Sequence, residues 1–370
     1  MLKTFHYLYS STFNPLSSGH GGNRRTAQIH ELLQQINASL SPLADHLNFK
    51  SAPFKVLDYL IALPASARAV GLPSKTSCFD WSYIQATESA LKMLYDNSVE
   101  VKGLLWENTK DYRIPYAVAG KLPLIAFPHN IESLVSYFPE ANLINYAPVS
   151  SVLGSELRQL AKADLVISIS EYDSWLLSSF GIKSFYLPYW PCVDVETSCL
   201  QIRDDRSLAS THSEFILVIG SAVNPPTVHG ILKFLEAFPK YHQLLDLEIL
   251  LVGYSTEIIT DLTTLPPNVR VLGSVDSISM NKLLTTCKCV LIHQEYGTGS
   301  LTKIPELLLS GVPIVASRIA SRNFSEHDDI LIYDEIGEIC DILKSNLNQP
   351  RRPVRNCQEE ALVLDKLISL

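Results

Sequence analysis

The chain has 370 residues, of which 46% are hydrophobic and 18% are charged, and its net charge is -8 at pH 7. This length and apolar content suffice for two domains with substantial cores. The acidic balance disfavours nucleic acid as a partner, and no apolar run is long enough for a membrane span, which leaves only peripheral membrane contact open.

The charge is uneven along the chain. Residues 1–190 hold 15 basic and 15 acidic residues, whereas residues 191–370 hold 15 and 23. Seven cysteines are scattered, without a Cys-X-X-Cys pair, which predicts reduced thiols in a cytoplasmic protein and no zinc site. Residues 3–9 alternate like a strand, so the sequence predicts no signal peptide.

The first half alternates short apolar runs with segments of helical spacing. Strands are predicted at residues 2–9, 54–60, 101–106, 122–127, 164–169 and 184–187. Helices are predicted at residues 23–36 and 81–95, and Ser170-Glu171 is typical of a capped helix start. This pattern predicts an N-terminal domain over residues 1–190.

A polar stretch without apolar periodicity follows, so residues 191–213 are predicted to form an inter-domain linker. The alternation restarts over residues 214–355, which predicts a second domain. Strands are predicted at residues 215–219, 247–252, 269–272, 290–293, 314–316 and 330–333, and helices at residues 227–238, 279–286, 301–310 and 335–346. A last helix, over about residues 356–370, is predicted to pack back on the first domain.

Strand–helix alternation in both halves predicts an α/β protein with two doubly wound, Rossmann-like domains. Ligands of such domains bind outside the carboxyl ends of the parallel strands. Two such domains facing a central cleft suit the transfer of a nucleotide-linked group to an acceptor. Acceptor specificity is expected in loops of the first domain such as residues 64–79.

The stretch from Gly297 to Glu306 lies between an apolar strand and a helix. Its glycines let backbone N–H groups approach a phosphate closely. Lys303 adds a positive charge, and Glu306 shares its helix face, where a carboxylate can accept hydrogen bonds from two ribose hydroxyls. The sequence therefore predicts a nucleotide-diphosphate site, with these donor-binding residues: Gly297, Gly299, Ser300, Leu301, Thr302, Lys303 and Glu306.

Further candidates come from the loops after other strands. His129 follows a strand, whose end would aim the side chain into the cleft, so it is a candidate for a catalytic role alongside Lys303; a structural histidine bonded to a backbone carbonyl is the alternative. Glu132 either orients His129 or the acceptor, or is a first-turn carboxylate favoured by the helix dipole. Gly21 and Gly22 would let the first loop approach a diphosphate.

Four more residues are weaker candidates. Arg24 and Arg25 lie near a helix start, where the dipole disfavours cations, which hints at an anionic ligand. Ser221 lies in the loop that opens the second domain. His293 ends a strand beside the glycine loop, and contact with the base or sugar is as plausible as a packed structural role.

Four stretches in this order resemble one family, the GT-B fold glycosyltransferases, especially the family-four-like retaining group; they are residues 19–25, 128–133, 219–227 and 297–315. The resemblance implies sugar transfer from a nucleotide-diphosphate donor without a metal ion or other cofactor. The donor would bind to the second domain, with Glu306 on the ribose and His129 on the sugar. The acceptor would be a saccharide, a lipid-linked sugar or a small molecule, and the enzyme a hexosyltransferase.

The chain departs from the family pattern in two places. Thr298 stands where the family often has a second glutamate, and the segment Ser221 to His229 lacks the usual Arg and Lys that grip the diphosphate. Two alternatives stay open: a non-catalytic nucleotide-sugar-binding protein and a sugar-nucleotide epimerase. A dehydrogenase is disfavoured because the first strand is not followed by a Gly-X-Gly-X-X-Gly loop.

Overall fold

A computed structural model describes residues 5–16, 19–46, 87, 89, 91–92, 101–107, 109, 113–135, 149–209, 215–241, 247–324 and 326–369. The chain forms two compact units. Unit 1 comprises residues 1–16, 26–188 and 356–370, and unit 2 comprises residues 17–25 and 189–355. The predicted strand at 54–60, most of the predicted helix at 81–95 and the expected acceptor loop at 64–79 lie outside the described residues.

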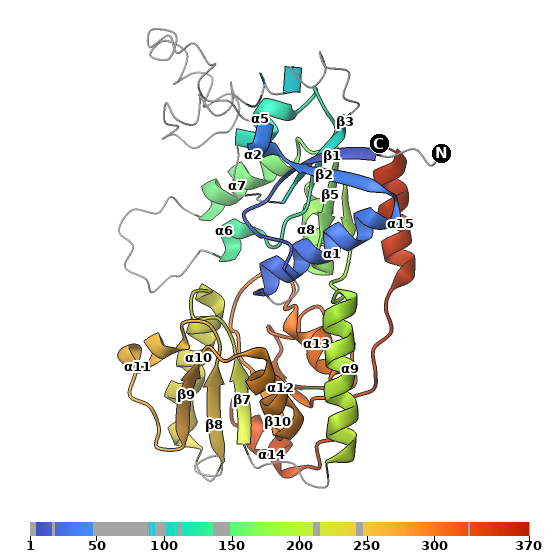
Figure 1. Ribbon diagram of the computed structural model, residues 1–370. Coiled ribbons are helices and arrows are strands. Elements are labelled where there is room, and N and C mark those ends of the chain that lie inside the picture. Colours follow the sequence, from blue (N-terminus) through green and yellow to red (C-terminus); the bar gives the residue numbers. More distant parts are fainter. Residues whose placement is uncertain are drawn as a thin grey trace. The chain divides into compact units, whose positions relative to one another are not determined.

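Unit 1 contains a parallel sheet whose described strands follow the order β2-β1-β3-β4-β5-β6 (Figure 1). Its strands are β1 (Phe5–Ser10), β2 (Ala38–Pro42), β3 (Val101–Trp106), β4 (Leu124–Ala126), β5 (Leu165–Ser168) and β6 (Ser184–Tyr186). The edge strand β2 was not predicted, because its sequence is short and rich in serine. It pairs in parallel with β1.

Apolar side chains cover both faces of this sheet, as expected for parallel strands. The helices of unit 1 are α1 (Gly21–Gln35), α2 (Leu43–His46), α5 (Arg113–Val118), α6 (Glu132–Val135), α7 (Val149–Leu160), α8 (Glu171–Ser179) and α15 (Cys357–Ser369). Helices α5 and α7 contribute to the core on one face, and α1 and α15 to the core on the other. The predicted cap of α8 is present, since the Ser170 hydroxyl accepts from Asp173 N–H.

The last helix, α15, packs on unit 1 as the sequence predicts. Val363 and Leu367 are buried in the same core as the side chains of β1 and α1. The Tyr7 hydroxyl donates to the Leu367 carbonyl oxygen at 3.0 Å. The carboxyl end of the chain is thereby tied to its first strand, although all of unit 2 intervenes in the sequence.

Unit 2 contains the second parallel sheet, with described strands in the order β12-β11-β10-β7-β8-β9. Its strands are β7 (Phe215–Ile219), β8 (Glu248–Val252), β9 (Val269–Gly273), β10 (Cys289–Ile292), β11 (Ile314–Ser317) and β12 (Ile330–Tyr333). Alternate residues of β7, β8 and β10 contribute to two cores on opposite faces. The two sheets confirm the predicted α/β, doubly wound architecture.

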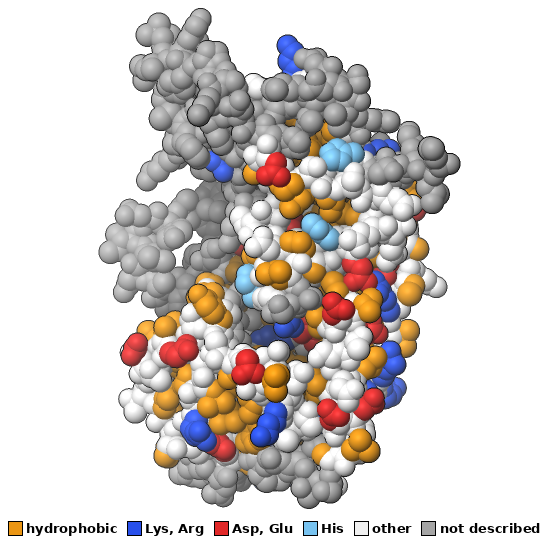
Figure 2. Space-filling view, viewed as in Figure 1, with side chains coloured by type: hydrophobic (Ala, Val, Ile, Leu, Met, Phe, Trp, Pro, Cys, Tyr) orange, Lys and Arg blue, Asp and Glu red, His pale blue; other side chains and the backbone are white. Residues whose placement is uncertain are grey.

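The helices of unit 2 are α9 (Val193–Leu208), α10 (Pro225–Ala237), α11 (Ile259–Leu262), α12 (Ser277–Thr286), α13 (Lys303–Leu309) and α14 (Glu338–Lys344), with short 3-10 turns η1 (Phe238–Lys240) and η3 (Thr256–Ile258). No helix among the residues described here is both long and apolar enough to cross a membrane. On the face shown in Figure 2, acidic and basic side chains of the described residues are interspersed.

The prediction of a linker over 191–213 is wrong for most of that range, because residues 193–208 form α9 and belong to unit 2. The helix buries Cys199, Ile202 and Arg206. Arg203 donates to the carbonyls of Leu308 and Leu309, and Arg206 to those of Leu284, Cys287 and Gly311. These arginines satisfy the last carbonyls of α12 and α13. The buried face of α9 is therefore partly cationic, which hid its helical period from an apolar pattern.

Candidate functional site

The predicted glycine loop follows β10 and leads to α13. Gly297 and Gly299 have φ angles of +129° and +71°, which other residues rarely adopt. Arg322 donates to the carbonyls of Thr298 and Gly299, and Asn323 donates to that of Gly299 at 2.7 Å. The loop is thus fixed by its carbonyls to the turn after β11.

Sequence reasoning missed Arg322 and Asn323. They lie more than twenty residues beyond the loop, and their own segment carries no glycine or charge pattern that points to a ligand. Their position just after β11, the strand next to β10, is the signal that could have found them, since neighbouring parallel strands end at the same edge of a sheet.

Lys303 is the first residue of α13, and its ammonium donates to the Ile219 carbonyl at the carboxyl end of β7. A Cβ added at Gly220 would lie 3.7 Å from this nitrogen. Burial, followed by the positive charge of Arg24, lowers the pKa of Lys303 to about 8. A small cavity adjoins the ammonium, and its lining consists of Val218, Ile219, Thr227, Ile231, Leu291, Ile292, His293, Gln294 and Lys303.

Glu306 lies one turn further along α13 and is only 8% exposed. Its Oε1 accepts a hydrogen bond of 2.7 Å from the Tyr189 hydroxyl, and its Oε2 pairs with Nη1 of Arg24. Burial raises the pKa of Tyr189 above its usual value, so this hydroxyl stays protonated and donates. Both oxygens of the predicted ribose-binding carboxylate are therefore engaged by groups of the same unit.

The sequence placed Gly21 and Gly22 in the loop before the first helix, α1. Both glycines are helical, so α1 begins at Gly21, two residues before its predicted start. A Cβ at Gly21 would lie 2.9 Å from the Thr302 hydroxyl. A larger residue at 21 would therefore push this loop away from the start of α13.

Arg24 and Arg25, near the start of α1, differ in their surroundings. Arg24 donates through Nε to the Gly19 carbonyl at 2.8 Å and through Nη1 to Glu306. Its side chain is 29% exposed. Arg25 is buried, with 1% exposure. Of these two candidates, the structure brings Arg24 to Glu306, the carboxylate predicted to bind the donor.

In unit 1, His129 follows β4 and contacts a carboxylate that the sequence did not single out. Its Nε2 lies 2.7 Å from Oε1 of Glu107, and the same oxygen accepts from the Thr26 hydroxyl at 2.6 Å. The Phe13 ring stacks on the imidazole at a centroid distance of 4.9 Å. The carboxyl ends of β1, β3 and β4 and the first turns of α1 thus supply one polar cluster.

Glu107 is buried, and burial alone would raise its pKa. Hydrogen bonds from His129, Ser11 and Thr26, together with the charge of His129, instead hold the pKa of this carboxyl below its usual range. Glu107 is therefore an anion at neutral pH, and it fixes the orientation of the imidazole.

Glu132 was predicted either to orient His129 or to begin a helix. Glu132 is the first residue of α6, and its side chain accepts from Asn130 at 3.2 Å. The first N–H groups of α6 donate to the buried Glu156 carboxylate at 2.8 and 2.9 Å. The orienting carboxylate of His129 is Glu107, and Glu132 has the position of a first-turn residue.

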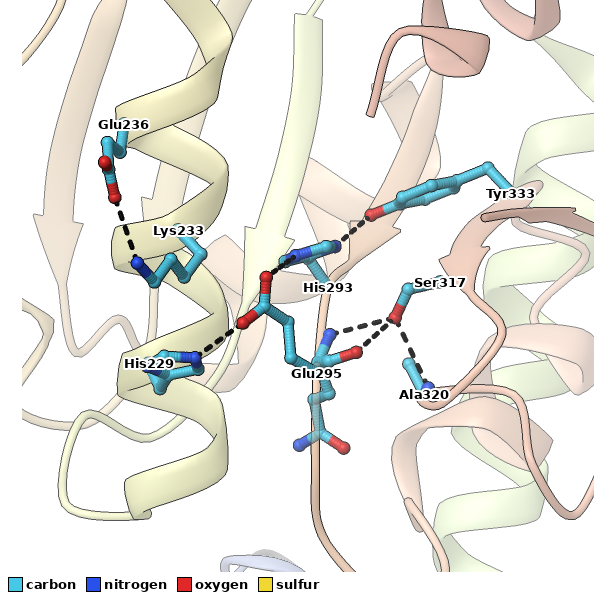
Figure 3. Close-up of polar contacts among 9 residues, drawn as sticks. His229, Lys233, Glu236, His293, Glu295, Ser317, Ala320 and Tyr333 are labelled. Atoms are coloured by element: carbon cyan, nitrogen blue, oxygen red, sulfur yellow. Dashed lines mark hydrogen bonds and ion pairs between the residues drawn. The ribbon is translucent and has the colours of Figure 1, made fainter. Parts of the chain in front are cut away.

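His293 directly follows β10 and belongs to a polar network, shown in Figure 3. Its Nδ1 lies 2.8 Å from the Tyr333 hydroxyl, and its Nε2 lies 3.7 Å from Glu295, which pairs with His229 at 2.7 Å. Burial lowers the pKa of His293, and the charge of Glu295 partly opposes this shift. Both ring nitrogens of His293 therefore have polar neighbours within unit 2.

Ser221 lies in the turn between β7 and α10. Its carbonyl accepts from Asn224 N–H at 3.2 Å, and the Asn224 side chain caps α10. Helix α10 itself packs closely on the end of β10: a Cβ at Gly230 would lie 1.9 Å from the His293 carbonyl oxygen. The turn is therefore held against the strand end from which the glycine loop departs.

Comparison with known proteins agrees with this arrangement. Residues 213–347 match the family model for Glycosyl transferases group 1. No curated protein sequence matches the chain. Among solved structures, sucrose-phosphate synthase from Thermosynechococcus elongatus has a TM-score of 0.66 at 15% identity, with 99% of this chain and 98% of that chain covered.

Two further structures bear ligands. HepE from Anabaena, in complex with UDP-glucose, has a TM-score of 0.61 at 14% identity, with 99% of this chain and 100% of that chain covered. The catalytic domain of starch synthase IV from Arabidopsis thaliana, bound to ADP and acarbose, has a TM-score of 0.58 at 12% identity, with 100% and 99% covered. The sequence match to the family is thus confined to residues 213–347, within unit 2, whereas the solved structures share the fold over nearly the whole chain.

Proposed function

We propose that this protein is a glycosyltransferase that moves a hexose from a nucleoside-diphosphate donor to an acceptor hydroxyl, with retention of the anomeric configuration and without a metal ion. The observation that carries the proposal is the arrangement of Lys303 and Glu306. They lie one turn apart at the start of α13, beside a glycine loop whose carbonyls are fixed by Arg322 and Asn323.

In this proposal unit 2 binds the donor. The two oxygens of Glu306 accept hydrogen bonds from the vicinal hydroxyls of the ribose. The Lys303 ammonium contacts the diphosphate, and the glycine loop approaches the hexose and phosphate with little steric hindrance. The structural neighbours crystallised with UDP-glucose and with ADP support a nucleoside diphosphate as the ligand class.

Unit 1 supplies His129 as the group that contacts the hexose. Glu107 occupies Nε2, which directs Nδ1 toward a sugar hydroxyl, and the Phe13 ring restricts rotation of the imidazole. Holding the hexose in one orientation reduces the entropy lost at the transition state. We assign Glu107 a positioning role, because it acts through His129.

The proposed reaction proceeds on one face of the hexose. The bond between the anomeric carbon and the phosphate oxygen breaks, and its electron pair leaves with the diphosphate. The acceptor oxygen forms the new bond on the same face, and its proton passes to an oxygen of the departing diphosphate. Lys303 stabilises the charge that develops there, an interaction stronger in the transition state than in the ground state.

One observation favours a second candidate, a nucleotide-sugar-binding protein without transfer activity. The segment from Ser221 to His229 supplies no Arg or Lys for the diphosphate, and Glu306 is already bonded to two side chains. An epimerase is the third candidate, and it would change the donor in the absence of any acceptor.

A donor panel tests the proposal. UDP-glucose, GDP-mannose and ADP-glucose are incubated with the protein, with and without a mixture of mono- and disaccharide acceptors and with EDTA throughout. Acceptor-dependent release of nucleotide and an α-anomeric product by ¹H NMR are expected. Release that requires added metal, or a β-anomeric product, would contradict the proposed mechanism, and an altered sugar without acceptor would identify an epimerase.

A further inference from the structure

Arg24 forms an ion pair with Glu306, the carboxylate that binds the ribose in the proposed function. Its Nη1 pairs with Oε2 of Glu306, while its Nε is anchored on the Gly19 carbonyl at 2.8 Å. The other oxygen, Oε1, accepts from the Tyr189 hydroxyl at 2.7 Å. Each carboxylate oxygen can accept two hydrogen bonds, but Glu306 is only 8% exposed, so a ribose that reaches both oxygens competes for space with these two partners.

Of the two partners, Arg24 is the one that can move. The Tyr189 side chain is buried, and without Glu306 its hydroxyl would lose this hydrogen bond while remaining buried, which is costly. The Arg24 side chain is 29% exposed, so its planar guanidinium can turn as one group toward solvent or another anion by rotation of its methylene stem.

A second anion is expected close by. Lys303 is near enough to Arg24 for the guanidinium charge to lower the pKa of Lys303. Of these two neighbouring cations, Arg24 is paired with a carboxylate, whereas Lys303 donates to the neutral carbonyl of Ile219. Arg24 also lies in the first turn of α1 with Gly21, which packs against Thr302 just before α13.

We propose that Arg24 exchanges partners when the donor binds, leaving Glu306 as the ribose arrives and contacting the diphosphate together with Lys303. This inference rests on the proposed function. Arg24 would then supply the cation that the loop after β7 lacks. Its ion pair with Glu306 would also neutralise the buried carboxylate while the site is empty.

If Arg24 exchanges partners in this way, its effect on affinity should differ between a nucleoside and the corresponding nucleoside diphosphate. A nucleoside without phosphates has to displace Arg24 and offers it no new anion. A nucleoside diphosphate displaces Arg24 and then pairs with it. Charge-assisted hydrogen bonds are stronger than neutral ones, so the diphosphate should add far more affinity in the presence of Arg24 than in its absence.

The experiment is isothermal titration of three matched pairs, uridine and UDP, adenosine and ADP, guanosine and GDP. The proteins are the wild type, Arg24→Ala, Arg24→Lys and the control Arg318→Ala, which removes an exposed arginine of the same unit. For the pair whose diphosphate binds, Arg24→Ala should weaken the diphosphate about 10- to 100-fold and leave the nucleoside unchanged or tighter. Arg24→Lys should recover part of the loss, and Arg318→Ala should match the wild type.

Other outcomes separate this inference from the proposed function. Equal weakening of nucleoside and diphosphate in Arg24→Ala would show a structural anchor and overturn the exchange, as would no change in either. If no diphosphate binds to the wild type, the proposed function itself fails. Should Arg24→Ala not fold, the same ratio measured for Arg24→Lys decides, because a lysine keeps the charge but loses the anchored fork.

Discussion

The two units build their candidate sites in different ways. In unit 2, the glycine loop, Lys303 and Glu306 lie within one segment of fourteen residues, 293–306, which joins one strand to the next helix. In unit 1, the His129 cluster draws side chains from three other places: Phe13, Thr26 and Glu107. A site of the first kind is visible as a motif, whereas a site of the second kind exists only after folding.

The family comparison shows the same asymmetry. The matching model covers residues 213–347, which lie in unit 2. The solved structures instead cover nearly the whole chain at 15% identity or less. Unit 1 therefore shares the fold of these structures, whereas the family model matches sequence within unit 2 only.

The largest expected effect separates the chemistry of the two units. His129→Ala should lower the transfer rate about 100- to 1,000-fold, because the hexose loses the group that orients it. The dissociation constant for the nucleoside diphosphate should change less than about twofold, since that ligand is assigned to unit 2. Steady-state transfer and titration with the diphosphate measure the two quantities.

His6→Ala is the matched control for this prediction. His6 lies near the amino end of β1, away from the strand ends that carry the site, and bonds to Ser39. A His129→Ala variant that loses diphosphate binding, or retains full transfer, would remove His129 from the hexose site.

The second prediction concerns the carboxylate of unit 2. Glu306→Gln should weaken binding of the nucleoside about 10- to 100-fold, because hydrogen bonds to a charged acceptor are worth about 1.5–3 kcal/mol. The diphosphate should lose less, since the same change releases Arg24. Titration of both ligands gives the two ratios, and Glu326→Gln, an exposed position of the same unit, serves as the control. An unchanged nucleoside affinity would refute the ribose assignment.

A smaller effect is expected at Glu107. Glu107→Gln keeps the shape but removes the negative charge beside His129, so the imidazole loses its stabilising partner. We expect transfer to fall about tenfold, with unchanged diphosphate binding. The loss should appear in kcat, with KM for the donor changed less than about twofold, because Glu107 acts on the orientation of His129 and not on donor binding. A loss of diphosphate binding together with the rate would mean that Glu107 is only structural.

The sequence predicted the strands of unit 2 almost residue by residue, because strands buried on both faces form continuous apolar runs. It also identified Lys303 and Glu306 as neighbours on one helix face. It did not predict α9, whose buried side includes Arg206, or β2, which is short and polar. A periodic pattern of apolar residues reveals a buried helix face or strand only where the buried side chains are themselves apolar.

The contacts that complete both sites were also beyond the sequence. The pairing of Glu306 with Arg24, 282 positions away, depends on where residues 17–25 fold. The choice of Glu107 rather than Glu132 as the partner of His129 depends on the order of β3 and β4 in the sheet. Sequence spacing favours the nearer carboxylate, and only the topology shows that the distant one lies at the same strand end.

The smallest expected effect is the change with pH in the affinity of unit 2 for the diphosphate. The pKa of Lys303 is lowered to about 8, and a bound diphosphate should raise it, so binding takes up a proton above that pH. The affinity for UDP, or for whichever diphosphate binds, should therefore fall by at most about tenfold per pH unit above pH 8. In Lys303→Arg the charge persists, and titration should give a flat profile up to pH 9.5. A flat profile in the wild type as well would mean that the ammonium does not contact the diphosphate, which would leave Arg24 as the cation that does.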